Sequence, residues 1–135
     1  MQIEIHKDRK LAELQNDFSL LFPFLKIAFF SDKHGKGKGS AKTDALDPET
    51  TVADCNATGS EGNLKLSADM TVAELEQTIY RDFGLAAQVF RKTGHHTWLE
   101  TTATDFWTLQ RQNQQGKEMM ELNRETKPAE EIDYD

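Results

Sequence analysis

The chain has 135 residues, of which 37% are hydrophobic, 29% are charged and 9% are aromatic. This length is typical of one domain, and the composition excludes collagen-like chains, disulfide scaffolds and fully disordered chains. With 16 basic and 23 acidic residues the net charge is −7, which argues against nucleic acid and against an anionic membrane surface as partners.

Two further features bear on where the protein works. Residues 1–10 carry charges and no apolar segment, and the apolar stretch at residues 20–30 is too short to span a membrane. The single Cys55 cannot form an internal disulfide and fits a reducing compartment. We therefore expect a cytoplasmic protein with no membrane contact.

The first part of the chain predicts a strand, a helix and a second strand. Residues 2–6 alternate polar and apolar side chains, as a half-buried strand requires. Asp8 is placed to cap a helix over residues 11–21, and Pro23 ends it. Residues 25–30 form the next strand. This order predicts two parallel strands in one sheet, joined by a right-handed crossover.

The middle of the chain looks different. Residues 31–42 are rich in Gly and Lys and show no apolar periodicity, so we expect a mobile loop over residues 31–50. The glycine spacing matches neither common phosphate-binding pattern, and a solvated loop is favoured over an anion site at Lys36 and Lys38. Residues 51–55 predict a short edge strand, and residues 63–67 predict another.

The strongest local signals begin at Thr71. Thr71 and Glu74 have the spacing of a capping box, and Gly84 is placed to end the helix in a left-handed conformation. Residues 87–92 and 97–102 predict a hairpin. Thr104 or Asp105 then caps a last helix that contains Phe106, Trp107 and Leu109 and ends at Gly116.

This order of elements predicts an α+β fold. We expect a ferredoxin-like βαββαβ sheet with its helices on one face, extended by a C-terminal strand and helix, with a β-grasp arrangement as the alternative. Residues 1–116 form one domain and residues 117–135 an acidic, frayed tail. The two helix-containing halves are loosely similar, but the sequence shows no repeat of fixed period.

Candidate binding residues gather on the predicted hairpin and just beyond it, because Trp and Arg are prominent in binding hot spots. They are Arg91, Lys92, His95, His96, Trp98 and Trp107. A structural role is the alternative, with one tryptophan closing the core and Arg91 paired to Glu100 across the strands. No metal-ligand spacing and no nucleophile with a base are evident, so we expect no metal, no cofactor and no catalytic residue.

Several stretches resemble a family of small bacterial proteins of unknown function. They are residues 21–27 (Leu-Phe-Pro-Phe-Leu-Lys-Ile), 70–76 (Met-Thr-Val-Ala-Glu-Leu-Glu), 88–94 (Gln-Val-Phe-Arg-Lys-Thr-Gly), 98–102 (Trp-Leu-Glu-Thr-Thr) and 104–109 (Thr-Asp-Phe-Trp-Thr-Leu). The resemblance covers most of residues 1–116 and implies no catalytic or binding residue.

The sequence favours a small non-catalytic interaction module over an enzyme. We expect it to bind another protein, or a second copy of itself, through the hairpin, with Lys36 and Lys38 as a second contact. The alternative is an enzyme or binding protein for a small anionic ligand, which would use the basic loop 33–42 and His95 or His96 as acid or base.

Overall fold

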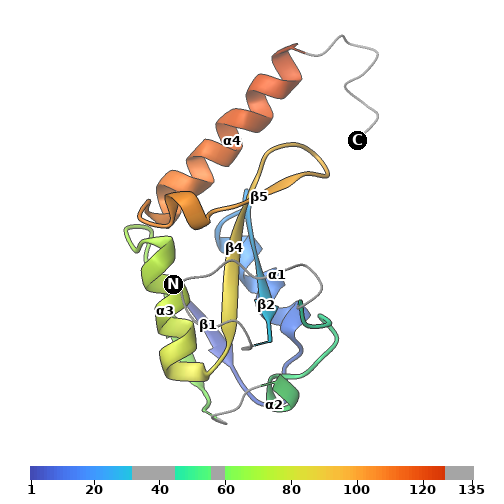
Figure 1. The fold of residues 1–135 in the computed structure, drawn as a ribbon, viewed down its shortest axis with the longest axis vertical. Helices are drawn as coiled ribbons and strands as arrows, with labels where there is room; N and C mark the ends of the chain where they lie inside the picture. The colour runs from blue at the N-terminus through green and yellow to red at the C-terminus, as the bar shows by residue number, and fades with distance from the viewer. Residues whose placement is uncertain (32–44, 56–59, 127–135) are drawn as a thin grey trace.

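The computed structural model describes residues 1–31, 45–55 and 60–126. In chain order the elements are β1 (Gln2–Ile5), α1 (Leu11–Leu21), β2 (Leu25–Phe30), α2 (Val52–Cys55), β3 (Gly62–Lys65), α3 (Val72–Phe83), β4 (Ala86–Lys92), β5 (Trp98–Glu100), the 3₁₀ helix η2 (Thr102–Thr104) and α4 (Leu109–Thr126) (Figure 1). The predicted α+β class is confirmed. None of the helices in the described ranges is both long and apolar enough to cross a membrane.

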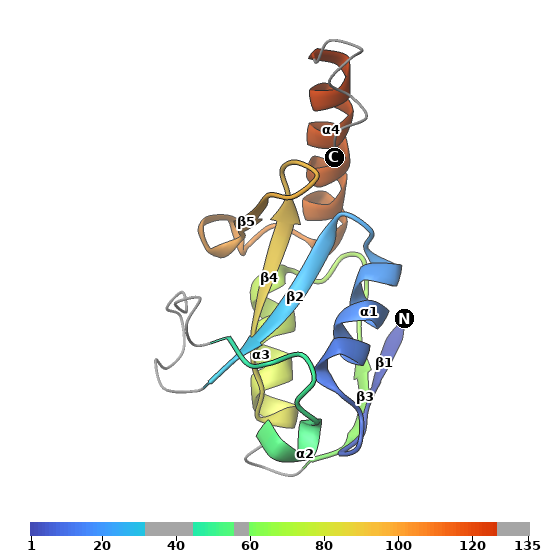
Figure 2. The same cartoon turned by 90° about the vertical axis from the view of Figure 1, so that its right-hand side faces the viewer.

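The strands form two antiparallel sheets. β1 pairs with β3, which places Ile3 opposite Leu64. The second sheet has the order β2-β4-β5 and places Ile27 opposite Val89. Figure 2 shows β1, β3 and α1 to one side of the β2–β4 pair. The prediction that the first two strands are parallel neighbours is therefore wrong. The single ferredoxin-like sheet is not found, and the β-grasp alternative is not confirmed.

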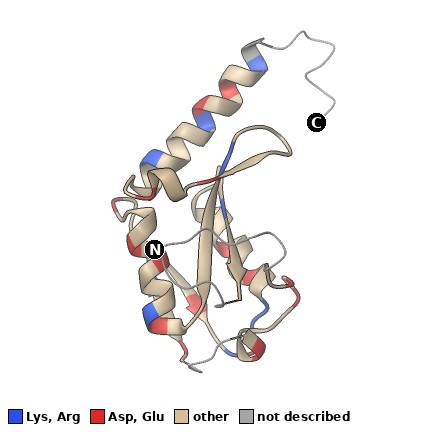
Figure 3. Ribbon diagram, viewed as in Figure 1, with Lys and Arg blue, Asp and Glu red and all other residues tan. Residues whose placement is uncertain are grey.

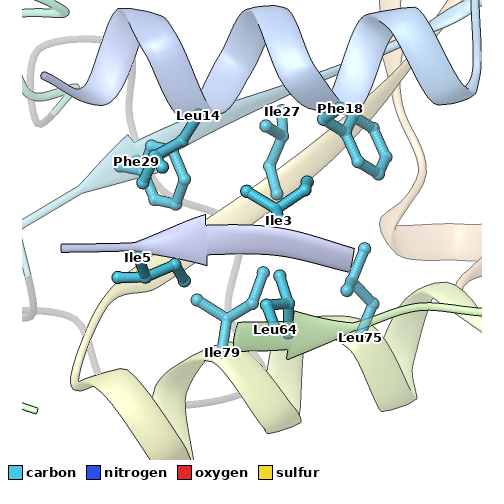
Figure 4. Close-up of a pocket in the computed structure, with 9 residues that line it drawn as sticks. All are labelled: Ile3, Ile5, Leu14, Phe18, Ile27, Phe29, Leu64, Leu75 and Ile79. Atoms are coloured by element: carbon cyan, nitrogen blue, oxygen red, sulfur yellow. The ribbon is translucent and has the colours of Figure 1, made fainter. Parts of the chain in front are cut away.

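The core lies between these two sheets, with α1 and α3 closing its other sides (Figure 4). Side chains of all these layers meet around one small cavity of about 10 Å³. It is lined by Ile3, Ile5, Leu14, Phe18, Ile27, Phe29, Leu64, Leu75 and Ile79. A space of this size holds one water at most, and its walls offer no polar group. The cavity is part of the core and does not serve as a ligand site.

The start of α1 is joined to the start of α2. The Leu11 N–H donates to the Thr50 carbonyl at 2.9 Å, and the Val52 N–H donates to the Arg9 carbonyl at 2.8 Å. The first N–H groups of a helix have no partner within that helix, so this exchange satisfies donors at both starts. It also corrects two predictions. Residues 51–55 give helix α2 instead of a strand, and Lys10, not Asp8, holds the N-cap position, without a side-chain cap bond.

The start of α3 is joined to the start of α4 in the same way. The Val72 N–H donates to the Trp107 carbonyl at 3.1 Å, and the Leu109 N–H donates to the Met70 carbonyl at 2.8 Å. The two halves of the chain thus share one arrangement, in which a long helix and a later helix begin against each other. This arrangement fixes the backbone of Trp107 next to the sheet.

The predicted features of α3 are confirmed. The Thr71 hydroxyl accepts from the Glu74 N–H at 3.1 Å, and the Glu74 carboxylate accepts from the Thr71 N–H at 2.9 Å. Gly84 follows the helix with φ 69°, a left-handed conformation that glycine adopts at little cost.

The last helix differs from its prediction at both ends. α4 begins at Leu109, so Phe106 and Trp107 precede it and neither Thr104 nor Asp105 caps it. It continues through the predicted end at Gly116 to Thr126. A residue with a Cβ at position 116 would place that atom 2.9 Å from the Phe24 Cβ, and the glycine lets α4 pack closely against the chain beside β2.

Two predicted segments fall partly outside the described residues. Of the expected mobile loop, residues 32–44 are not described, whereas the Leu46 N–H donates to the Phe29 carbonyl at 2.8 Å. Of the expected tail, residues 117–126 belong to α4 and residues 127–135 are not described.

Candidate binding surfaces on the β4–β5 hairpin

The β4–β5 hairpin presents the predicted binding residues on two opposite faces. Lys92 and Trp98 are cross-strand partners and share the outer face of the sheet, which points away from the core. Arg91 lies opposite Leu99 on the other face, on the same side as the core residue Leu25. The structure therefore brings Lys92 and Trp98 together and separates them from Arg91. The expected cross-strand pairing of Arg91 with Glu100 is wrong, because Glu100 lies opposite Phe90.

Four residues make up the outer-face cluster, namely Lys26, Phe90, Lys92 and Trp98. The Lys26 Nζ lies 4.6 Å from the Trp98 ring centroid and 5.5 Å from that of Phe90. The Lys92 Nζ lies 5.5 Å from the Trp98 centroid. A cation–π contact holds an ammonium group in place without bringing a negative charge to it. All four residues are half-buried and keep part of their surface in contact with solvent.

A second group, the helix-side cluster, consists of Arg91, Trp107, Arg111 and Gln112. The guanidinium carbons of Arg111 and Arg91 lie 3.8 Å and 5.5 Å from the Trp107 ring centroid. Arg91 Nη1 donates to Gln112 Oε1 at 2.8 Å. The Gln112 side chain is fully buried, and its Nε2 donates to both the carbonyl and the hydroxyl of Thr104 at 2.9 Å. Burial lowers the pKa of the Arg91 guanidinium.

A shallow, open polar groove runs along one face of α4 beside the helix-side cluster, and all of its lining residues lie on this helix or, for Thr108, directly before it. It is lined by Thr108, Gln110, Arg111, Gln114, Gln115 and Glu118. Arg111 belongs both to the groove and to the cluster, so the two features form one continuous surface.

The two predicted histidines belong to neither cluster. His95 and His96 lie in the turn between β4 and β5, where His95 is half-buried and His96 is exposed. Within residues 1–31, 45–55 and 60–126, no group of three or more His, Cys, Asp or Glu side chains is arranged to hold a metal ion. The predicted contacts Lys36 and Lys38 lie outside the described residues.

Several basic side chains outside the two clusters form ion pairs. Arg9 pairs with two carboxylates, Lys10 pairs with Glu49, and Arg81 pairs with Asp82. In the part of the chain that the structure describes, Arg91, Lys92 and Arg111 have no carboxylate within ion-pair distance. Figure 3 shows basic positions near the hairpin ends of β2 and β4 and along α4. Each cluster thus brings two basic side chains to one tryptophan ring.

A carboxyl group that the sequence did not indicate as part of a site is that of Glu76, a half-buried residue on α3. Its Oε2 accepts from the Val89 N–H of β4 at 2.9 Å. Burial raises the pKa of Glu76 to about 7, and the charges of Asp105 and Glu100 also raise it, whereas the Val89 hydrogen bond lowers it. This carboxyl group is engaged with the backbone of the sheet, so it joins α3 to β4.

The lone thiol is held by local contacts. Cys55 Sγ donates to the Thr51 carbonyl at 3.4 Å. Burial, with the charge of Asp54, raises the pKa of the Cys55 thiol. Because the thiolate is the reactive form, this environment disfavours a nucleophile.

Comparisons of the chain with protein-family models, curated proteins and solved structures find no match.

Proposed function

We propose that this chain is a non-catalytic recognition module that binds an acidic segment of another protein through the outer-face cluster. The observation that carries the proposal is the position of two ammonium groups, those of Lys26 and Lys92, over the single ring of Trp98. An aromatic ring orients a cation, and among the described residues Lys92 has no carboxylate within ion-pair distance. Trp98 adds the large, rigid contact area that is common in binding hot spots.

The same geometry favours acidic side chains over nucleobases as the ligand. Single-stranded nucleic acids bind to aromatic rings whose faces are open for stacking. Here the Trp98 ring already carries two cations, and the Phe90 ring carries Lys26. The net charge of −7 also opposes a long polyanion. A short acidic peptide segment needs only a few local cations, and this surface supplies them.

A cytoplasmic location belongs to this proposal. The only cysteine, Cys55, is half-buried and hydrogen-bonded as a thiol, a state that a reducing compartment preserves.

Affinity capture from cell extract tests the proposal. The baits are the unaltered chain, a Lys26→Gln/Lys92→Gln double variant, and Lys65→Gln as a control on the other sheet. Removing the two ammonium groups leaves Trp98 in place, and thermal unfolding checks that each bait is folded. We expect the unaltered chain and the control to capture the same protein, which the double variant loses and which hexaglutamate peptide displaces.

Two results would contradict the proposal. One is capture of the same protein by all three baits, because the two lysines would then not contribute to binding. The other is displacement by hexalysine and not by hexaglutamate, because the partner would then recognise acidic groups of this chain instead of its cations.

A further inference from the structure

We propose that the helix-side cluster is a separate site for a phosphate group, formed by Arg91 and Arg111 on the Trp107 ring. It lies on the opposite face of the hairpin from the outer-face cluster. The inference is therefore independent of the proposed recognition of an acidic protein.

The first argument comes from Arg91. Its guanidinium is partly withdrawn from water, which disfavours the charged form, and Nη1 donates to the neutral amide of Gln112. Within the described residues no carboxylate offsets this charge. Arg91 is half-buried, and an anionic ligand would pair with its partly desolvated charge. Arginine has five N–H donors in a fixed fork, which leaves donors for such a ligand.

The second argument is that this guanidinium is held in place before any ligand arrives. The fully buried Gln112 amide fixes Arg91 on one side and is itself bonded twice to Thr104. The backbone that carries the ring is also fixed, because the Trp107 carbonyl accepts from the Val72 N–H. Groups that are already oriented lose little conformational freedom on binding, which favours affinity.

The third argument is the number of charges. The guanidinium carbons of Arg91 and Arg111 lie 5.5 Å and 3.8 Å from the Trp107 centroid, so two guanidinium groups contact one ring. Guanidinium forks match the oxygen geometry of phosphate and often bind it with two parallel hydrogen bonds. Two cations balance a phosphate dianion, whereas a single carboxylate would neutralise only one of them.

The groove along α4 indicates what the rest of the ligand looks like. This open surface carries Arg111 at one end and Glu118 further along the helix. Amide and hydroxyl side chains line the space between these two charges. A phosphorylated small molecule fits this surface if its body carries hydroxyl or amino groups that can donate to Glu118 and the glutamines.

The test is a titration of the full chain with inorganic phosphate, at about pH 7.5, where phosphate is mostly dianionic. Chloride keeps the ionic strength constant, and the signal is the NMR resonance of the Trp107 indole N–H. We expect a saturable shift for the unaltered chain. Arg111→Gln should weaken binding about tenfold, which corresponds to the loss of one charge-assisted hydrogen bond.

Lys117→Gln is the matched control, because it removes the same charge from the same helix outside the groove. Arg111 and Lys117 are both exposed, so neither change threatens the fold. A shift that does not saturate, or an equal loss in the Lys117 variant, would overturn the phosphate site. Either result would leave the capture experiment with the outer-face cluster unaffected, so the two proposals fail separately.

Discussion

Gln15 on α1 and Glu76 on α3 hold equivalent positions in the two halves of the chain, and each bonds the strand that follows its helix. Gln15 Nε2 donates to the Ile27 carbonyl at 2.9 Å, and Glu76 Oε2 accepts from the Val89 N–H at 2.9 Å. Ile27 and Val89 are cross-strand partners. The two bonds therefore attach α1 and α3 to the same pair of residues in the sheet, one through a neutral amide and the other through a carboxyl group.

The carboxyl group makes stability depend on pH. Burial raises the pKa of Glu76 from 4.5 to about 7. Between these values the folded chain keeps a proton that the unfolded chain has released. The contribution of Glu76 to the free energy of unfolding is therefore most favourable below pH 4.5 and is lost as the pH rises through 7. The loss is about 3 kcal/mol for a shift of this size.

Glu76→Gln should remove this dependence, because the amide keeps an acceptor for Val89 and carries no charge. We expect the free energy of unfolding to rise by about 2 kcal/mol near pH 8 and to stay the same near pH 4.5. Urea unfolding at both pH values measures this, with the exposed Glu121→Gln on α4 as the control. The free energy of unfolding of the Glu76 variant could still differ between the two pH values as much as that of the unaltered protein. This result would contradict the assignment of the pH dependence to Glu76.

Gly116→Ala should destabilise the protein although alanine favours helices. A Cβ at position 116 would lie 2.9 Å from the Phe24 Cβ and 3.1 Å from the Phe24 carbonyl oxygen, so α4 has to shift. We expect a loss of about 1–3 kcal/mol from overpacking, which outweighs a propensity gain of about 1 kcal/mol. Denaturant unfolding measures it, with the exposed Gln114→Ala on the same helix as a near-neutral control. An increase in stability at position 116 would show that the close contact is absent.

Thr71→Ala should cost about 1 kcal/mol, because it removes the hydroxyl that caps the Glu74 N–H. Thr71→Ser keeps the hydroxyl and should stay close to the unaltered protein. Chemical unfolding of both variants separates the cap from other effects of the side chain. Equal losses in the two variants would mean that the hydroxyl bond does not stabilise α3.

Local features of the fold were predictable from the sequence, whereas strand partners were not. The capping box of Thr71 and Glu74 depends on residues three positions apart, and Gly84 acts through its own backbone. The alternation of Ile3 with polar residues fixes its buried face but leaves open which strand lies beside it. A signal was present, because residues 11–14 read Leu-Ala-Glu-Leu and residues 72–75 read Val-Ala-Glu-Leu. This similarity indicates two related halves, whose corresponding strands pair with each other.

The site was predicted only in part, because its residues come from segments that are far apart in the chain. The hairpin and its tryptophan were found from local sequence, but Arg91 and Trp98 were assigned to one surface, and only the register of β4 and β5 shows that they lie on opposite faces. Lys26 was missed because its neighbour in space, Trp98, is far away in the chain. Arg111 was missed because α4 was expected to enclose Trp107, whereas the helix begins after it.

The most direct test of the account is an NMR titration of the full chain with hexaglutamate peptide at low salt. The account predicts saturable amide shifts centred on Lys26, Phe90, Lys92 and Trp98, which weaken as salt is added because the contact is electrostatic. Shifts of the same size with hexalysine, or shifts that leave these four residues unchanged, would contradict an acidic partner at the outer-face cluster.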